Sequence, residues 1–217
     1  MPDDLKPVPI FPLPTVVLFP RLRVPLHIFE PRYRQMTEQV LRGDNQIGMV
    51  TVLPDCVDKM SGDPPVYEIG CAAIIRDADR LPDGRYNIVI EGTRRFRLVD
   101  EHPRSSNLLY RVADVEFIDE PEATNLTALR VRVTEQVDRI ARLLGNSDGV
   151  PPDAFDAFDD ETFTHSLANG FNFAAGEKQG LLEANSVRER LERLSDIFEF
   201  ALAELQAGRA PNSGSLH

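Results

Sequence analysis

The hydrophobic pattern changes its period once along the chain, near residue 119, and this change limits the possible folds. Before that point, short runs of β-branched and aromatic residues alternate with polar residues and are separated by Pro or Gly. After it, apolar residues recur at spacings of three and four, as in an amphipathic helix: Leu126, Leu129, Val133, Val137, Ile140 and Leu144. The sequence therefore predicts an α+β protein, with a β-rich domain over 1–118, a helical bundle over 119–207 and a disordered tail over 208–217.

The stretch Pro25–Met36 marks a strand-to-helix transition inside the β-rich domain. Leu26–Phe29 predicts a short apolar strand, and Pro31 stands at a first helical position, where its missing N–H costs no hydrogen bond. The helix is predicted to run to about Arg42, just before Gly43. We expect it to lie against a sheet, because four apolar residues share one of its faces: Tyr33, Met36, Val40 and Leu41.

Prolines are concentrated at the start of the chain. Eight of the 17 prolines occur by position 31, among short β-prone pieces that include Val16–Phe19. Proline cannot donate to a sheet ladder, so we expect edge or corner strands that bend at each proline. Such strands suit a closed or half-closed barrel.

Later stretches predict the remaining strands of this domain: Gln46–Leu53, Glu68–Arg76, Tyr86–Glu91 with a break at Gly92, Arg94–Val99 and Leu109–Ile118. The small residues Gly70, Ala72 and Ala73 permit a close approach of a neighbouring element. Between two of these strands, Pro82, Asp83 and Gly84 predict a tight turn and therefore a hairpin.

In the helical part, three shorter patterns predict helices at Thr162–Asn169, Glu177–Ala184 and Val187–Leu205. Ser186 and Glu189 have the spacing of a capping box at the start of the last helix. The acidic run at 153–161 lacks the glycine and the spacing of an EF-hand loop, which indicates helix starts and solvated surface.

Composition argues against several classes of function. The formal net charge is −11 and there are only three lysines, which disfavours broad nucleic-acid binding. Cys56 and Cys71 form no C-x-x-C pair and the four histidines are scattered, so we expect reduced thiols, no metal and no cofactor. No apolar run reaches the roughly 18 residues of a membrane span, and the first residues lack a secretory pattern, so a cytoplasmic location is expected.

Three segments together resemble the N-terminal domain of the ATP-dependent protease Lon, also called the Lon substrate-binding domain. The first contains Pro9–Pro14, Val16–Pro20 and Pro25–Tyr33, similar to the family's opening P-x-L-P-L and P-L-x-I-F patterns. The second, Leu81–Arg97, is similar to its L-P-D-G hairpin and following E-G-x-x-R-x-R strand. The third, Glu177–Leu194, is similar to its E-K-Q and R-L-x-x-L helices. The resemblance implies a β domain of pseudo-barrel type related to the PUA fold, followed by a helical bundle.

The same resemblance sets an expectation about catalysis. In full-length Lon an ATPase module and a serine–lysine peptidase domain follow this region. None of the three lysines here lies in a G-x-x-x-x-G-K-[ST] loop, and their surroundings do not support a serine–lysine dyad. The chain is therefore expected to be a stand-alone, non-catalytic member that recognises unfolded or extended protein segments, with a separate protease or chaperone as a further candidate partner.

The predicted recognition surface lies at the 25–36 stretch, with apolar contacts from Phe29 and Tyr33 and polar contacts from His27, Arg32 and Arg34. Two alternatives remain open at this point. The two aromatic residues are common core residues at such a junction, and the arginines are commonly solvated or paired. An exposed sheet edge can also accept an extended peptide by strand addition.

RNA binding is the alternative function. Arg95 and Arg97 alternate with Phe96 and Leu98, which predicts one core face and one solvated, basic face. Because PUA-like folds often bind RNA, such a face is a plausible stacking platform. The strongly negative net charge counts against this function.

Overall fold

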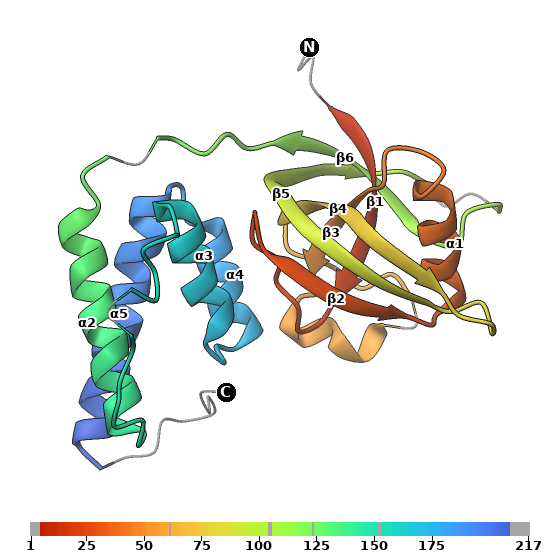
Figure 1. The fold of residues 1–217 in the computed structure, drawn as a ribbon. Coiled ribbons are helices and arrows are strands. Elements are labelled where there is room, and N and C mark those ends of the chain that lie inside the picture. Colours follow the sequence, from red (N-terminus) through yellow and green to blue (C-terminus); the bar gives the residue numbers. More distant parts are fainter. Residues whose placement is uncertain (1–4, 61, 104–105, 123, 152, 209–217) are drawn as a thin grey trace. The chain divides into compact units, whose positions relative to one another are not determined.

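A computed structural model describes residues 5–60, 62–103, 106–122, 124–151 and 153–208 (Figure 1). The chain divides into two compact units, with the boundary between Asp119 and Glu120. We call them the β unit and the helical unit. The α+β class expected from the sequence is confirmed. The predicted tail lies, from residue 209 onward, outside the described residues.

In the β unit, the described residues form a six-stranded sheet in the order β2-β5-β4-β3-β1-β6. An additional β5–β6 pairing closes five of these strands into a barrel and leaves β2 outside the ring, paired with β5. The strands are β1 (Lys6–Leu13), β2 (Arg23–Ile28), β3 (Gln46–Thr51), β4 (Ile69–Arg80), β5 (Tyr86–Glu101) and β6 (Arg111–Phe117).

The prolines of β1 and β2 lie where each strand has a neighbour on one side only. β1 pairs with β6 over Lys6–Ile10 and with β3 over Ile10–Leu13, so only Ile10 has both neighbours. β2 pairs with β5 alone. A proline at such a position can turn its missing N–H away from the ladder, which explains how a proline-rich segment enters this sheet.

Two clusters of buried side chains lie on opposite faces of the sheet. One includes Val8, Val50, Ala72 and Phe96; the other includes Cys71, Ala73 and Ile75 of β4 together with one face of the helix α1 (Pro31–Val40). Successive residues of a strand point to opposite faces, so both faces of β4 are covered. The α1 residues of the second cluster are those predicted to face a sheet, except for half-exposed Leu41: Tyr33, Met36 and Val40.

Close packing between strands depends on the small residues of β4. A Cβ atom on Gly70 would lie 2.5 Å from the carbonyl oxygen of Met49 and 2.5 Å from the Phe96 ring. No side chain fits there without displacing backbone, so the expected close approach at Gly70 is confirmed.

The predicted hairpin joins β4 to β5. Leu81 and Arg85 pair across the turn, with the Arg85 carbonyl accepting from the Leu81 N–H at 2.8 Å, and Gly84 has φ +81°. Only glycine adopts that backbone conformation without a steric penalty.

Two predictions about the β unit were wrong. β5 does not break at Gly92 but continues through it, because Gly92 still pairs with Ala73 of β4, and the sequence irregularity appears as a register shift between this pair and Cys71–Arg95. A Cβ at Gly92 would lie 2.2 Å from the Phe19 carbonyl oxygen. Val16–Phe19 is not a strand either. It is an irregular connection whose Val17, Leu18 and Phe19 side chains are buried. A short 3₁₀ helix, Pro54–Lys59, lies in the predicted polar loop.

The helical unit contains α2 (Thr127–Leu143), α3 (Asp160–Gly170), α4 (Ala175–Glu183) and α5 (Val187–Gln206) (Figure 1). α2 and α5 pack together, and their buried contact includes reciprocal hydrogen bonds between Gln136 and Ser195. The Ser186 hydroxyl caps α5 by accepting from the Glu189 N–H at 3.1 Å, as predicted. The Glu189 carboxylate instead accepts from the Asn185 N–H at 2.9 Å.

A completely buried guanidinium, that of Arg190 on α5, joins this helix to α3 and α4. Its Nε donates to the Leu181 carbonyl at 2.9 Å, and its Nη2 donates to the Ala184 carbonyl at 3.2 Å. Its Nη1 lies 2.9 Å from the Nε2 of buried His165, and Glu120 accepts from Nη2 at 3.4 Å. Since a guanidinium only donates, the Nε2 of His165 accepts, and this nitrogen carries no proton.

Candidate functional site

The junction between β2 and α1 separates the predicted contact residues into exposed and buried ones. The Phe29 side chain is 60% exposed, whereas Tyr33 is 3% exposed and its ring centroid lies 4.2 Å from that of Phe11. β2 ends at Ile28, so Phe29 falls in the link to the helix, while Tyr33 lies on the face of α1 that packs on the sheet. Of the two aromatic residues, Phe29 alone is available to a partner.

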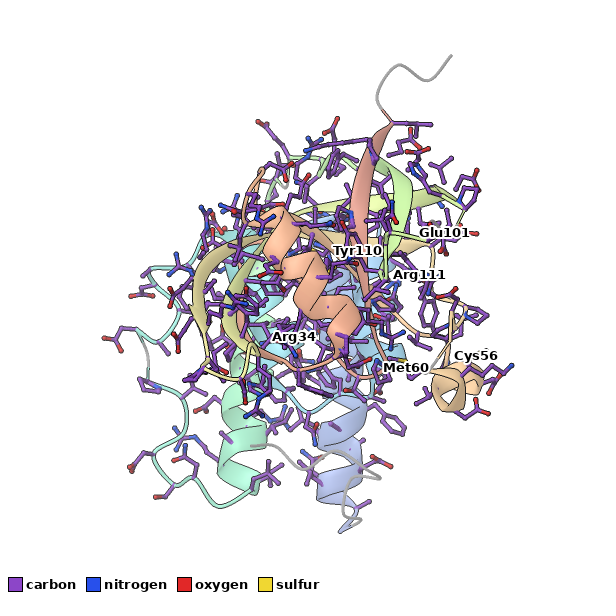
Figure 2. All side chains as sticks on the ribbon, turned by 90° about the vertical axis from the view of Figure 1, so that its right-hand side faces the viewer. Arg34, Cys56, Met60, Glu101, Tyr110 and Arg111 are labelled. Atoms are coloured by element: carbon purple, nitrogen blue, oxygen red, sulfur yellow. The ribbon has the colours of Figure 1, made fainter. Side chains whose placement is uncertain are left out.

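Arg32 is held by the protein itself. Its guanidinium donates to the Met60 carbonyl at 2.6 Å and to the Gly62 carbonyl at 3.2 Å, forms an ion pair with Glu30, and lies over the Tyr33 ring. These contacts attach the loop that follows the 3₁₀ helix to the first turn of α1. Figure 2 shows Met60 to one side of α1. Arg32 thus stabilises the loop rather than facing solvent.

Exposed His27 and Phe29 and partly buried Arg34 lie around the tip of the β4–β5 hairpin. The Nε2 of His27 lies 3.2 Å from Arg85, its Nδ1 lies 2.7 Å from Asn87, and its ring is stacked on Phe29 at 6.2 Å. Arg34 reaches the turn from α1, since its Nη2 lies 2.2 Å from where a Gly84 Cβ would be. We name His27, Phe29, Arg34, Asp83 and Arg85 the hairpin-tip patch.

The charged groups of this patch interact with one another. The Arg85 N–H donates to Asp83 at 3.0 Å, and this hydrogen bond is the largest of the effects that hold the pKa of Asp83 below its ordinary value. The guanidinium groups of Arg85 and Arg34 lower the same pKa further. With two arginines around one carboxylate, the patch keeps a positive balance beside an exposed aromatic ring.

A shallow pocket of about 260 Å³ adjoins the patch (Figure 2 labels Arg34 beside α1). Arg80 lies over the Tyr86 ring and forms an ion pair with Glu38 at 3.5 Å, so these three side chains form one wall. Arg34 and Gly84 form another part of its lining. The pocket extends the patch along α1 and is large enough for one side chain of a partner.

The prediction of a solvated, basic face on β5 was wrong at Arg95. This residue is only 3% exposed, because the face of β5 opposite Phe96 is also covered. Arg95 pairs with Cys71 of β4, and Cys71 belongs to the buried cluster that also contains Leu18. Arg97 is exposed and forms an ion pair with Glu68 at 3.3 Å. A stacking platform made from Arg95 and Arg97 is therefore not present.

Asp83 and Arg85 were not among the predicted site residues, although the sequence contained a signal for them. The L-P-D-G-R turn was recognised as a hairpin, and its side chains project where the neighbouring strand β2 ends at Ile28, which pairs with Tyr86. That pairing, which the sequence pattern did not predict, brings residues 27–29 and 83–85 together.

The described part of the chain contains no group of three or more His, Cys, Asp or Glu side chains arranged to hold a metal ion. Within the same residues, both cysteines are free thiols, with Cys71 buried and Cys56 partly exposed. No helix among the described residues has the length and apolar character to cross a membrane.

Comparisons with known proteins agree on one family. The family model for the ATP-dependent protease La (Lon) substrate-binding domain matches residues 7–199. The chain is 26% identical over 215 residues to Lon protease of Azorhizobium caulinodans and 30% identical over 200 residues to that of Brucella melitensis. These alignments cover 95% and 91% of this chain but only 24% of either relative.

Solved structures show the same fold. The N-terminal domain of Mycobacterium avium complex Lon protease superposes with a TM-score of 0.69 at 19% identity, covering 89% of this chain and 98% of that one. A Lon N-terminal domain protein from Xanthomonas campestris gives 0.62 at 25% identity, covering 87% and 96%. With the family model matching nearly the whole chain, the protein belongs to the Lon substrate-binding domain family.

Proposed function

We propose that this protein recognises segments of other proteins through the hairpin-tip patch and does so without cleaving them. Membership of a family named for substrate binding supports a recognition role. The patch supports a location for it, because it combines an exposed aromatic ring with arginine side chains beside a small pocket. The segments that fit best have an apolar side chain for Phe29 and an acidic or carbonyl group for Arg34.

The observation that carries this proposal is the exposure of Phe29. A phenylalanine that is 60% exposed leaves much of its ring in water, at a position between a buried strand residue and a helix. Covering the ring with a partner would remove that apolar surface from water. The His27 ring is positioned by Arg85 and Asn87 and stacks on one side of Phe29. The Phe29 side chain therefore has less conformational freedom to lose on binding.

Strand addition at the free edge of β2 is a weaker explanation. Pro25 lies in the middle of this edge strand and offers no N–H to a peptide. The Arg23 side chain in the same strand forms an ion pair with Glu91 of β5 at 2.7 Å. Proline and charged side chains are the features by which edge strands avoid pairing with other chains. We therefore place recognition at side chains of the patch rather than at the strand edge.

A binding titration tests the proposal. A fluorescently labelled, permanently unfolded protein, such as reduced and carboxymethylated lactalbumin, is titrated with the full chain and followed by fluorescence anisotropy. Phe29→Ala should raise the Kd by about tenfold, the usual effect of truncating a central aromatic contact. Arg34→Gln should raise it by a smaller factor.

The matched control is Phe200→Ala, which removes the same side chain from α5, where it is 66% exposed. We expect its Kd to stay within twofold of the wild-type value. An equal loss in both variants would show general adhesion to exposed aromatic residues, and an unchanged Kd for Phe29→Ala would exclude the patch as the binding site.

The absence of cleavage is tested separately. Fluorescent casein is incubated with the purified chain, with and without ATP and Mg²⁺, and fragments are measured by gel electrophoresis. We expect intact casein under both conditions. Fragments that appear in proportion to the protein concentration, and survive further purification, would contradict a non-catalytic role.

A further inference from the structure

A groove on α2 of the helical unit lies far along the sequence from the hairpin-tip patch and is built differently. It has a volume of about 570 Å³, within the range of ligand-binding clefts. One wall is α2, and the other is the segment that leads into α3. The residues of this α2 groove that could contact a partner or shape its walls are Arg130, Val131, Glu135, Phe155, Asp156 and Phe158.

The second wall is fixed in place by Arg130. Its guanidinium donates to the Phe158 carbonyl at 2.9 Å and to the Phe155 carbonyl at 3.1 Å, and it forms an ion pair with Asp160 at 2.9 Å. It also lies over the buried Phe163 ring at 4.4 Å. The guanidinium of Arg130 is thus already paired within the wall. These contacts give the groove its shape without a partner.

Apolar surface lies open inside this groove. Val131 is 54% exposed on α2, and the rings of Phe155 and Phe158 are only partly buried, with centroids 6.2 Å apart. Three apolar side chains that line one open groove from two walls offer a partner more burial than scattered surface residues do. The groove therefore suits an apolar side chain of a partner.

The charge around the groove is negative. Glu135 and Asp156 are exposed at its rim, and Asp160 is paired with Arg130. The sequence between Arg142 and Lys178 contains seven carboxylates and no lysine or arginine. Residues 120–217 carry 17 acidic and nine basic side chains, a formal net charge of −8, against −3 for the rest of the chain. Such a field attracts cationic groups and repels anionic ones.

We propose that the α2 groove binds a polypeptide segment in which an apolar side chain is followed or preceded by lysine or arginine. The apolar side chain occupies the space between Val131 and the two phenylalanines, and the cation pairs with Glu135 or Asp156. This chemistry is opposite in charge to that of the hairpin-tip patch. The inference uses different residues in the other unit, so it goes beyond the proposed function and does not depend on it.

The test uses the full chain and three labelled 12-residue peptides, followed by fluorescence anisotropy. One peptide contains leucines flanked by lysine and arginine; in the second, glutamate replaces the cations; in the third, serine replaces the leucines. We expect binding of the first peptide only, weakening as the salt concentration rises. Equal binding of the first two peptides, or binding of none, would overturn the proposal.

Variants locate the site. The double variant Glu135→Lys with Asp156→Lys reverses two exposed rim charges and should raise the Kd of the basic peptide by at least about tenfold. The matched control, Asp196→Lys with Glu204→Lys, makes the same change in net charge at α5 residues that do not line the groove, and should change the Kd by less than twofold. An equal loss of peptide affinity in the two double variants would show that the effect comes from overall charge, and would refute the site.

Two further variants separate this inference from the proposed function. Val131→Ser removes apolar surface from the groove and should weaken the basic peptide several-fold. Phe29→Ala, which lowers the affinity of the unfolded protein for the hairpin-tip patch, should leave the Kd of the basic peptide within twofold of the wild-type value. Loss of basic-peptide binding in Phe29→Ala alone would assign that peptide to the hairpin-tip patch and contradict the α2 groove.

Discussion

Replacing Arg190 by methionine should destabilise the helical unit severely. The guanidinium is completely buried and donates to the Leu181 and Ala184 carbonyls, to His165 and to Glu120. Methionine fills a similar volume but leaves these acceptors without that donor. Removing one partner from a buried charged network costs about 3–5 kcal/mol. For a unit of this size each kcal/mol lowers the melting temperature by about 4–8 °C, so we expect a drop of at least about 12 °C.

Far-UV circular dichroism at 222 nm measures this effect, because the helical unit contains most of the helix in the described chain. The control is Arg132→Met on α2, whose ion pair with Glu199 joins side chains that are 54% and 66% exposed. Exposed pairs contribute about 0–1 kcal/mol, so its transition should move little. If Arg190→Met melts within about 3 °C of the wild type, the buried network does not stabilise the unit and the reasoning fails.

Three further changes have defined outcomes. Gly84→Val should cost more than about 1 kcal/mol by calorimetry, because a β-branched residue is strained at φ +81°; an unchanged melting temperature would exclude that backbone conformation. Gly180→Ala should stabilise α4 by about 0.5–1 kcal/mol, since a Cβ there meets nothing within 4 Å; destabilisation would reveal a crowded site. The pKa of Glu91 is lowered, first by its hydrogen bond to Arg76 and then by that to Arg23. Its folded pKa lies below the unfolded value, so its contribution is complete above the ordinary value of 4.5 and is lost as the pH falls through the folded pKa. Glu91→Gln should therefore flatten the decline of melting temperature below pH 4.5, and parallel curves would contradict this linkage.

The elements of the fold were largely predictable because local patterns determine them. The hairpin follows from Pro82, Asp83 and Gly84, and the cap of α5 follows from Ser186. Features that depend on distant pairing were not predictable. The alternation around Phe96 predicted one solvated face, yet the irregular segment before β2 contributes Leu18 to the cluster on the opposite face.

The candidate site was predicted in part for the same reason. Helical spacing correctly placed Tyr33 on the buried face of α1, but spacing alone cannot distinguish a core contact from a recognition surface. Phe29 lies between two elements, where no periodicity applies, so its exposure emerged only in the structure. Arg32 donates hydrogen bonds to the carbonyls of Met60 and Gly62, and no local sequence pattern predicts that these carbonyls lie beside it.

The pairing of β1 with both β3 and β6 has a consequence for the order in which the chain can fold. Lys6 pairs with Val115, so more than a hundred residues must be synthesised after β1 emerges from the ribosome before its last partner is complete. Closing so long a loop is slow compared with forming helices from neighbouring residues. Until β6 arrives, the proline-rich first strand has an unpaired edge that offers few N–H groups to other nascent chains. In the finished barrel these prolines lie where β1 has a neighbour on one side only. During synthesis the same prolines thus protect the incomplete barrel from association with other chains.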